Sequence, residues 1–217
     1  MAKLGYGTVA AIYDWLGHVW TGGQIRASKL SQLDNIHAGQ RVLYAGAGTG
    51  EDALEAARRG AKVVVVELAP EMLARVQRRF DEAGLHAELI CGDLFAHARP
   101  GAYDLVAANY FLNVFGRARM EAMAAHLTAQ LKPGGTLMIA DFAPPSGNLL
   151  QRLGAELHHG IPALVFALIV QQVPHTIYDY RPLLAGLGLR LDEVRYFRLY
   201  GRGPRRLMSL TATRVPG

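Results

Sequence analysis

Three glycines at alternate positions between two apolar runs are the residues whose types and spacing most directly suggest chemistry. They are Gly46, Gly48 and Gly50. Because glycine has no Cβ atom, such a turn adopts unusual dihedrals and lets a ligand approach the backbone closely. The flanking runs, 42–45 and 63–66, are typical of parallel strands that are covered on both faces. The pattern predicts a strand, a glycine-rich turn, a helix and a second strand.

The helix and the acid after it suggest what the turn binds. We expect the helix to begin near Thr49 or Gly50 and to end at Gly60, a suitable C′ glycine. Its N-terminus leaves N–H groups that point toward whatever lies over the strand end. Glu67 ends the second strand, ~20 residues after the first glycine, where an acid accepts hydrogen bonds from ribose hydroxyls. The unit therefore predicts a nucleoside site.

The glycine spacing distinguishes between nucleosides. A dinucleotide fingerprint reads G-x-G-x-x-G, with a third glycine that packs the helix on the strand. Here Glu51 stands at that position, and the third glycine comes one residue earlier, at Gly50. The spacing G-x-G-x-G resembles motif I of the class I S-adenosylmethionine (SAM)-dependent methyltransferases.

Four further segments resemble the same family in the expected order. Residues 67–73, E-L-A-P-E-M-L, resemble its second motif, an acid followed by a helix that opens on proline. Residues 91–94, C-G-D-L, resemble the segment whose Asp receives the adenine amino group. Residues 103–109 resemble the fourth strand, and 131–137 resemble the L-K-P-G-G turn that leads into the fifth.

The resemblance implies a fold, a cofactor and a set of cofactor-binding residues. The fold is α/β: a Rossmann-like, doubly wound seven-stranded sheet with a C-terminal antiparallel hairpin and an N-terminal helical cap. The cofactor is SAM. One departure is Tyr44, which stands where the family usually carries an acid that helps to hold the methionyl part of SAM. The residues implied for the cofactor in the core are Gly46, Gly48, Gly50, Glu67, Leu68, Met72, Asp93, Leu94 and Asn109.

The N-terminal residues resemble one branch of the family. Tyr13-Asp14, followed by Gly23, Arg26 and Lys29, is similar to the segment that precedes the glycine motif in ubiquinone/menaquinone C-methyltransferases. In that group the segment covers the cofactor. The resemblance implies that Tyr13 or Lys29 reaches the SAM carboxylate and partly replaces what Tyr44 lacks. The alternative is that these side chains serve helix packing and the helix surface.

The 217 residues suit one domain, because no composition break or low-complexity segment divides them. We expect a helical cap over 1–40, a cofactor-binding core over 41–141, an apolar insertion over 142–188 and a terminal hairpin over 189–217. Within the core and the hairpin, the pattern predicts helices near 50–59, 70–83, 94–98 and 117–131, and late strands over 187–199 and 206–213.

The apolar insertion suggests the acceptor. Such a segment suits a lipophilic substrate, and its alternative role is core packing or a homodimer contact. If the acceptor is a ring carbon, a base must take a proton, and His158, His159 and Tyr110 are the candidates. His175, Tyr178 and Asp141 are also in the right segments. We expect no metal site, because His158 and His159 are adjacent and would point in different directions on a helix.

Composition sets the remaining expectations. The single cysteine, Cys91, excludes an internal disulfide, and the first residues lack a signal-peptide pattern, so we expect a cytoplasmic protein. The longest apolar run, 161–170, is too short to span a bilayer. The net charge of +5 includes many arginines after residue 180. They form either a solvated face or a patch for anionic lipid at the inner membrane face; nucleic acid is a weaker fit.

The sequence thus predicts a SAM-dependent methyltransferase that acts on a small, lipophilic acceptor such as a quinone precursor. Two alternatives stay open. One is N- or O-methylation of a phospholipid or another small molecule. The other, suggested by Tyr44, is a nucleotide-binding protein that keeps the fold without transferring methyl groups.

Overall fold

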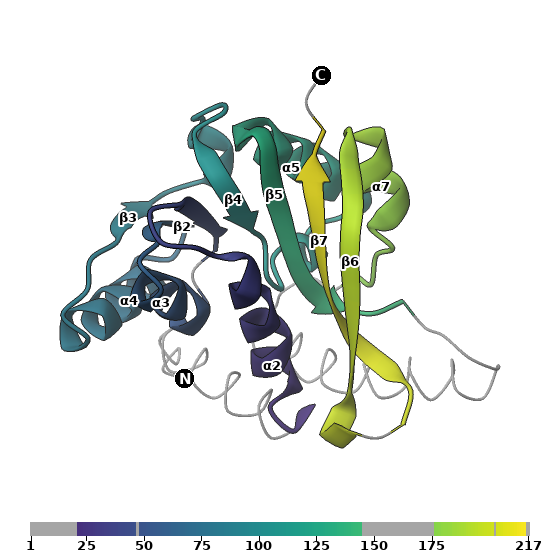
Figure 1. The fold of residues 1–217 in the computed structure, drawn as a ribbon, viewed down its shortest axis with the longest axis horizontal. Helices are drawn as coiled ribbons and strands as arrows, with labels where there is room; N and C mark the ends of the chain where they lie inside the picture. The colour runs from purple at the N-terminus through teal and green to yellow at the C-terminus, as the bar shows by residue number, and fades with distance from the viewer. Residues whose placement is uncertain (1–20, 47, 145–175, 202, 216–217) are drawn as a thin grey trace, which may run out of the picture.

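One mixed sheet organises the chain in the computed structural model, which describes residues 21–46, 48–144, 176–201 and 203–215. Its strand order is β3-β2-β1-β4-β5-β7-β6 (Figure 1). β1 to β5 pair in parallel, and β7 runs antiparallel between β5 and β6. The predicted doubly wound, seven-stranded sheet with a C-terminal hairpin is confirmed. The strands are β1 Arg41–Ala45, β2 Lys62–Glu67, β3 Glu88–Cys91, β4 Tyr103–Ala107, β5 Leu131–Phe142, β6 Leu189–Arg198 and β7 Arg205–Arg214.

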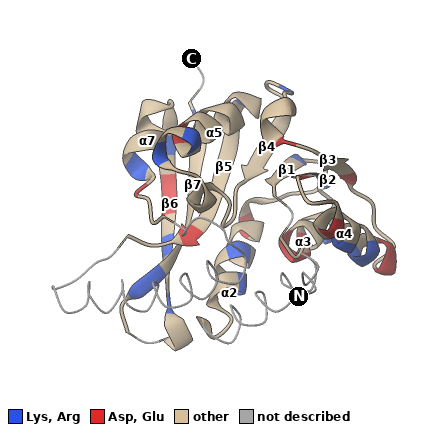
Figure 2. Ribbon diagram, turned by 180° about the vertical axis from the view of Figure 1, so that it is seen from behind, with Lys and Arg blue, Asp and Glu red and all other residues tan. Residues whose placement is uncertain are grey.

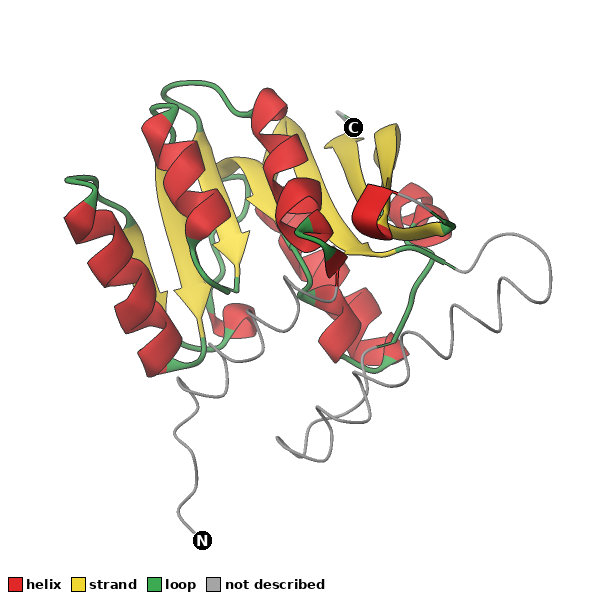
Figure 3. Cartoon of the chain, turned by 90° about the horizontal axis from the view of Figure 1, so that it is seen from below, coloured by secondary structure: helices red, strands yellow, loops and turns green. Residues whose placement is uncertain are grey.

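Helices pack alongside this sheet (Figure 3). The α-helices of the described residues are α2 Gln24–Leu30, α3 Glu51–Arg58, α4 Pro70–Glu82, α5 Arg117–Gln130 and α7 Arg181–Gly186. Short 3-10 helices are η1 Ser31–Asn35, η2 Leu94–Ala96, η3 Leu112–Val114 and η4 Leu199–Gly201.

Successive strand residues enter two separate cores. On β1, Val42 and Tyr44 pack with residues of η1, α3 and α4, whereas Leu43 and Ala45 pack with residues of α5 and α7. The valines of β2 divide in the same way. Both faces of these strands are therefore covered, which explains why the sequence shows continuous apolar runs rather than alternation.

The helix after the glycine turn ends as predicted. Gly60 has φ 85° and its N–H donates to Ala57 O at 2.9 Å, while the N–H of Ala61 donates to Ala56 O at 3.2 Å. These two bonds form a Schellman motif, which requires a left-handed residue at C′. Pro70 likewise stands in the first turn of α4.

One expectation about helices is wrong, and one helix was not predicted. The helix predicted near 94–98 is only the three-residue η2, because the backbone is already extended at His97 and Pro100 and Gly101 follow in the short connection to β4. The sequence patterns also missed α7, which lies within the predicted insertion and buries Leu184 in the second core. The other predictions for the insertion, and those for residues before 21, lie outside the described residues.

The cap helix α2 contacts both the helix that follows the glycine turn and the C-terminal hairpin. It packs against β5, β6 and β7 and also against α3 (Figure 1). Arg195 of β6 donates from Nη1 to the carbonyl oxygen of Ser31 at 3.0 Å, directly after α2. The hairpin therefore helps to hold α2 beside the glycine turn.

Gly50 provides a test of how tightly this turn is packed. It has φ 69°, and a Cβ there would lie 2.8 Å from Val76 Cγ2, whereas Gly84 has φ 65° and a Cβ there would meet nothing within 4 Å. We expect Gly84→Ala to lower the free energy of unfolding by about 1–2 kcal/mol through backbone strain alone. Gly50→Ala should cost about 1–3 kcal/mol more, because it also overpacks the α4 contact. Urea unfolding measures both losses, and equal losses would contradict the packing argument.

Candidate functional site

The carboxyl ends of the parallel strands meet at one edge of the sheet. The N–H of Gly46 donates to Val66 O at 2.9 Å, and the N–H of Gly92 donates to Glu67 O at 3.0 Å. These bonds join the ends of β1, β2 and β3, and Asn109 follows the neighbouring β4. Chain order reverses between β1 and β4, which is where open α/β sheets bind their ligands.

The glycine turn forms a cradle of backbone. Gly46, Gly48 and Gly50 all have positive φ, at 81°, 48° and 69°. A Cβ at Gly46 would lie 3.1 Å from the ring of Phe111, and a Cβ at Gly48 would have only Lys29 Nζ nearby, at 4.0 Å. A nucleoside can therefore approach the main chain between these two side chains, which fits the expected cofactor.

Glu67 and Leu68 stand beside this cradle. Glu67 Oε1 accepts a hydrogen bond from the N–H of Ala69 at 2.8 Å, which fixes the carboxylate at the strand end. Leu68 is 71% exposed, so it presents an apolar surface that suits a purine ring. Met72 and Leu94 are buried, so they can shape the site only from beneath.

Asp93 combines a structural contact with an open side. Its Oδ1 accepts from the N–H of Phe95 at 3.0 Å and so caps η2. Its Oδ2 lies 3.9 Å from Arg119 Nη2, and about half of its side chain is exposed. Capping uses one oxygen, so it is compatible with ligand binding at the other.

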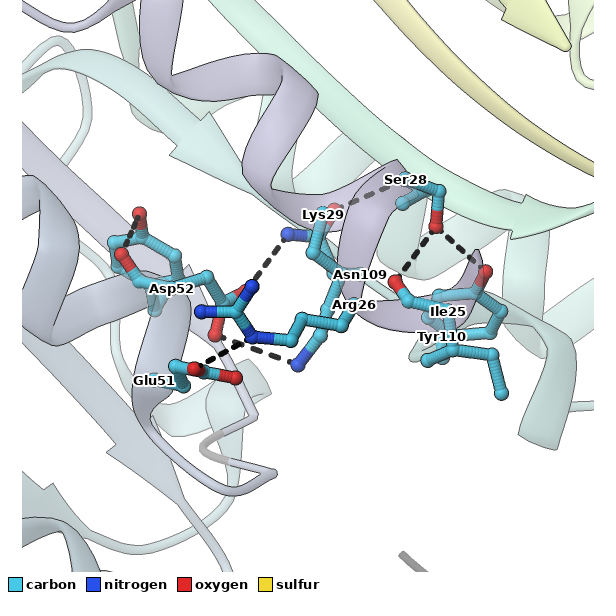
Figure 4. A network of polar contacts seen from close by, with 10 residues as sticks. Ile25, Arg26, Ser28, Lys29, Glu51, Asp52, Asn109 and Tyr110 are labelled. Carbon is cyan, nitrogen blue, oxygen red and sulfur yellow. Dashed lines mark hydrogen bonds and ion pairs between the residues drawn. The ribbon is translucent and has the colours of Figure 1, made fainter. Parts of the chain in front are cut away.

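Asp52 is a buried acid that contacts both Lys29 and Asn109 (Figure 4). It was not among the residues predicted from the sequence. Lys29 Nζ lies 3.5 Å from its Oδ1, and Asn109 Nδ2 donates to its Oδ2 at 3.0 Å. Asn109 Oδ1 in turn accepts from the N–H of Ala140 at 2.9 Å. The structure thus assigns Asn109 a positioning contact: its amide connects the end of β5 to Asp52. In the sequence Asp52 resembles an ordinary acid in the first turn of a helix, which the helix dipole favours.

Tyr44 supports the same turn from below. It is buried, and its hydroxyl donates to the main-chain oxygen of Asp52 at 3.1 Å. Burial, followed by the nearby Asp52 carboxylate, raises the pKa of this hydroxyl well above its usual value. Tyr44 is therefore neutral, and it anchors the first turn of α3.

Two further contacts tie α2 to this edge (Figure 4). Arg26 Nε lies 2.7 Å from Glu51 Oε1. Ser28 Oγ lies 2.8 Å from the Tyr110 hydroxyl and donates to Ile25 O, so Tyr110 is the donor to Ser28. Tyr110 also has φ 51°, a strained backbone conformation of the kind that clusters at functional sites.

The candidate bases fall into two groups. His158, His159 and His175 lie outside the described residues. The same is true of Tyr13, the candidate in the predicted cap for the SAM carboxylate. Tyr178 donates from its hydroxyl to Phe115 O at 2.8 Å and so serves packing. Among the described residues no group of three or more His, Cys, Asp or Glu side chains could hold a metal ion.

Asp141 is enclosed by donors at the end of β5. Its Oδ1 accepts from Asn113 Nδ2 and from the N–H of Phe142, both at 2.7 Å, and its Oδ2 accepts from the Tyr180 hydroxyl at 2.5 Å. Burial raises the pKa of Asp141 to about 7 despite these bonds. The cluster joins β5 to η3 and to the segment before α7, so its role is structural.

The arginines near the C-terminus are partly neutralised within the hairpin. Arg190 and Arg195 pair with Asp192 and Glu193 at 3.1 and 2.7 Å, and Figure 2 shows acids between the basic residues of β6. Contact with anionic lipid stays a prediction. No helix in the described part of the chain is long and apolar enough to cross a bilayer.

Asp141 makes stability depend on pH. Its pKa is above the ordinary 3.8, so the fold favours the protonated carboxyl; this stabilisation is complete below about pH 4 and is lost as pH rises through 7. Asp141→Asn keeps an acceptor for Asn113 and Phe142 but cannot titrate. We expect the wild type to lose stability relative to this variant between pH 4 and 7, by at most about 1.4 kcal/mol per pH unit. Urea unfolding at several pH values measures the difference, and a constant difference would contradict the role of burial.

Comparison with known proteins agrees with this geometry. Residues 42–135 match the model of a methyltransferase domain. The demethylmenaquinone methyltransferase of Thermus thermophilus is 32% identical over 145 residues, which are 64% of this chain and 65% of that protein. The ubiquinone/menaquinone biosynthesis C-methyltransferase UbiE of Azotobacter vinelandii is 28% identical over 194 residues, 86% of this chain and 74% of that protein.

Solved structures agree on the fold. The magnesium protoporphyrin IX methyltransferase of Synechocystis, crystallised with bound SAM, superposes with a TM-score of 0.66 at 18% identity, over 99% of this chain and 86% of that one. A SAM-dependent methyltransferase from Methanosarcina mazei gives the same TM-score and identity over 85% and 96%. The motifs and the sheet order are thus those of the class I SAM-dependent methyltransferase fold, and in sequence the chain is similar to the ubiquinone/menaquinone C-methyltransferases.

Proposed function

We propose that this protein transfers a methyl group from SAM to a small, lipophilic acceptor of the quinone-precursor class. The observation that carries the proposal is the set of contacts at the sheet edge: a backbone cradle of three glycines, Glu67 beside an exposed Leu68, and Asp93 on the next strand end. The acceptor class is supported by the relatives, which are named as demethylmenaquinone and ubiquinone/menaquinone methyltransferases.

Bound SAM supplies a methyl group that is already activated on a sulfonium sulfur. The protein then needs mainly to hold the cofactor, align an acceptor and exclude water. Glu67 would accept from the ribose hydroxyls, Leu68 would pack on the adenine, and the Oδ2 of Asp93 would accept from the adenine amino group. α2, tied to α3 by the Arg26–Glu51 pair and beside Tyr110, would cover the site from one side.

Two aromatic side chains near the end of β4 favour an apolar acceptor. Phe111 lies over Gly46, and the Tyr110 ring meets the edge of Phe142 with centroids 5.6 Å apart. Tyr110 is held by Ser28, so in our proposal it positions the acceptor rather than removing its proton. His158 and His159 remain the proposed bases for a ring-carbon acceptor.

Cofactor binding can be tested through Glu67. In calorimetric titrations we expect the wild type to bind SAM and S-adenosylhomocysteine but not NAD. Glu67→Gln should weaken SAM binding ~10- to 100-fold, because a hydrogen bond to a charged group contributes about 1.5–3 kcal/mol. Glu82→Gln, at the far end of α4, is the matched control and should bind as the wild type does. If Glu67→Gln also bound as the wild type does, Glu67 would not be a ribose ligand.

The transfer itself needs a labelled-methyl assay. A reduced, prenylated quinone precursor in detergent should accept the label at carbon, whereas phosphatidylethanolamine should not. Labelling of the lipid amine instead would favour the N-methyltransferase alternative. SAM binding without labelling of any acceptor would favour a non-catalytic protein on the same fold.

A further inference from the structure

We propose that Lys29 and Asp52 together bind the amino-acid end of the cofactor, with its ammonium at Asp52 and its carboxylate at Lys29. This inference rests on the proposed function. It assigns to Asp52, in the first turn of α3, the contact that Tyr44 cannot make from the end of β1.

The position of the pair supports this assignment. Lys29 Nζ is the atom nearest to the open side of Gly48, 4.0 Å from where a Cβ would stand. Asp52 lies directly after the glycine turn, and Asn109 holds its Oδ2 from the end of β4. Both charges therefore stand at the point where strand order reverses and a ligand is expected.

The burial of the pair supports it further. The side chains of Lys29 and Asp52 are only 13% and 6% exposed, and a buried charge is costly unless it is paired. Their separation of 3.5 Å is long compared with 2.7 Å for the neighbouring, exposed Arg26–Glu51 pair. Both pairs join α2 to α3, but the Lys29–Asp52 pair is more buried and less closely spaced than the Arg26–Glu51 pair.

A zwitterion is the ligand that such a pair suits. An amino-acid group carries one ammonium and one carboxylate, so it can replace one ion pair by two and leave neither buried charge unpaired. A ligand with a single charge would leave Lys29 or Asp52 without its partner. The pair therefore selects the methionyl end of SAM rather than a simple anion or cation.

Tyr44 and Asn109 explain why an acid at this position is held firmly. The Tyr44 hydroxyl holds the main chain of Asp52, and the Asn109 amide holds its side chain. The helix dipole alone does not explain why Asp52 is buried. Glu51 is an acid in the same first turn of α3, and its side chain is much more exposed than that of Asp52. In this proposal the acid that contacts the cofactor is Asp52, in the first turn of α3, instead of a residue at the end of β1, where Tyr44 stands.

The test compares SAM with 5′-methylthioadenosine, which keeps the nucleoside and lacks the amino-acid end. In calorimetric titrations Asp52→Asn should weaken SAM binding ~10- to 100-fold and change methylthioadenosine binding less than ~2-fold. The double variant Lys29→Met/Asp52→Asn, which leaves no single buried charge, should show the same selective loss. Glu55→Gln is the matched control on the next turn of α3, where the acid pairs with Arg58, and it should leave both affinities unchanged.

The remaining outcomes separate this inference from the proposed function. If the variants weakened both ligands equally, or neither, while the wild type still bound SAM, the pair would be structural and the inference would be overturned. If the wild type did not bind SAM at all, the proposed function would fail, and this inference would fail with it.

Discussion

The burial of one carboxylate, Asp52, is the constraint on which the site depends. A buried acid must be paired and hydrogen-bonded, and Asp52 meets this need with Lys29 from the cap and Asn109 from the end of β4. The same requirement therefore links three elements: α3, which carries Asp52, α2, which carries Lys29, and the end of β4, which Asn109 follows. The Arg195–Ser31 bond extends the connection to the C-terminal hairpin.

This constraint changes how the departure at Tyr44 is understood. A tyrosine in place of an acid suggests a weakened cofactor site when the sequence is considered alone. In the structure the tyrosine is a buried support, and an acid stands at the adjacent helical turn. The electrostatic requirement of a cationic cofactor is thus compatible with this chain, and Tyr44 by itself does not argue for a non-catalytic protein.

Local patterns predicted much of the fold, and distant pairings explain most of what was missed. The glycine turn, the apolar strands and the C′ glycine at Gly60 follow from short-range rules about dihedrals and burial. The predicted helix near 94–98 is wrong because the connection there is short and contains Pro100. Asp52 was not predicted, because its importance comes from Lys29 and Asn109, which are far from it in the sequence and meet it only after the sheet forms.

The most direct test of the account is a crystal structure of the protein with S-adenosylhomocysteine. We predict density for the adenosine beside Leu68 and Glu67, and density for the amino-acid end between Lys29 and Asp52. A nucleoside bound at any other place on the sheet edge, or an amino-acid end that points away from α2, would contradict it.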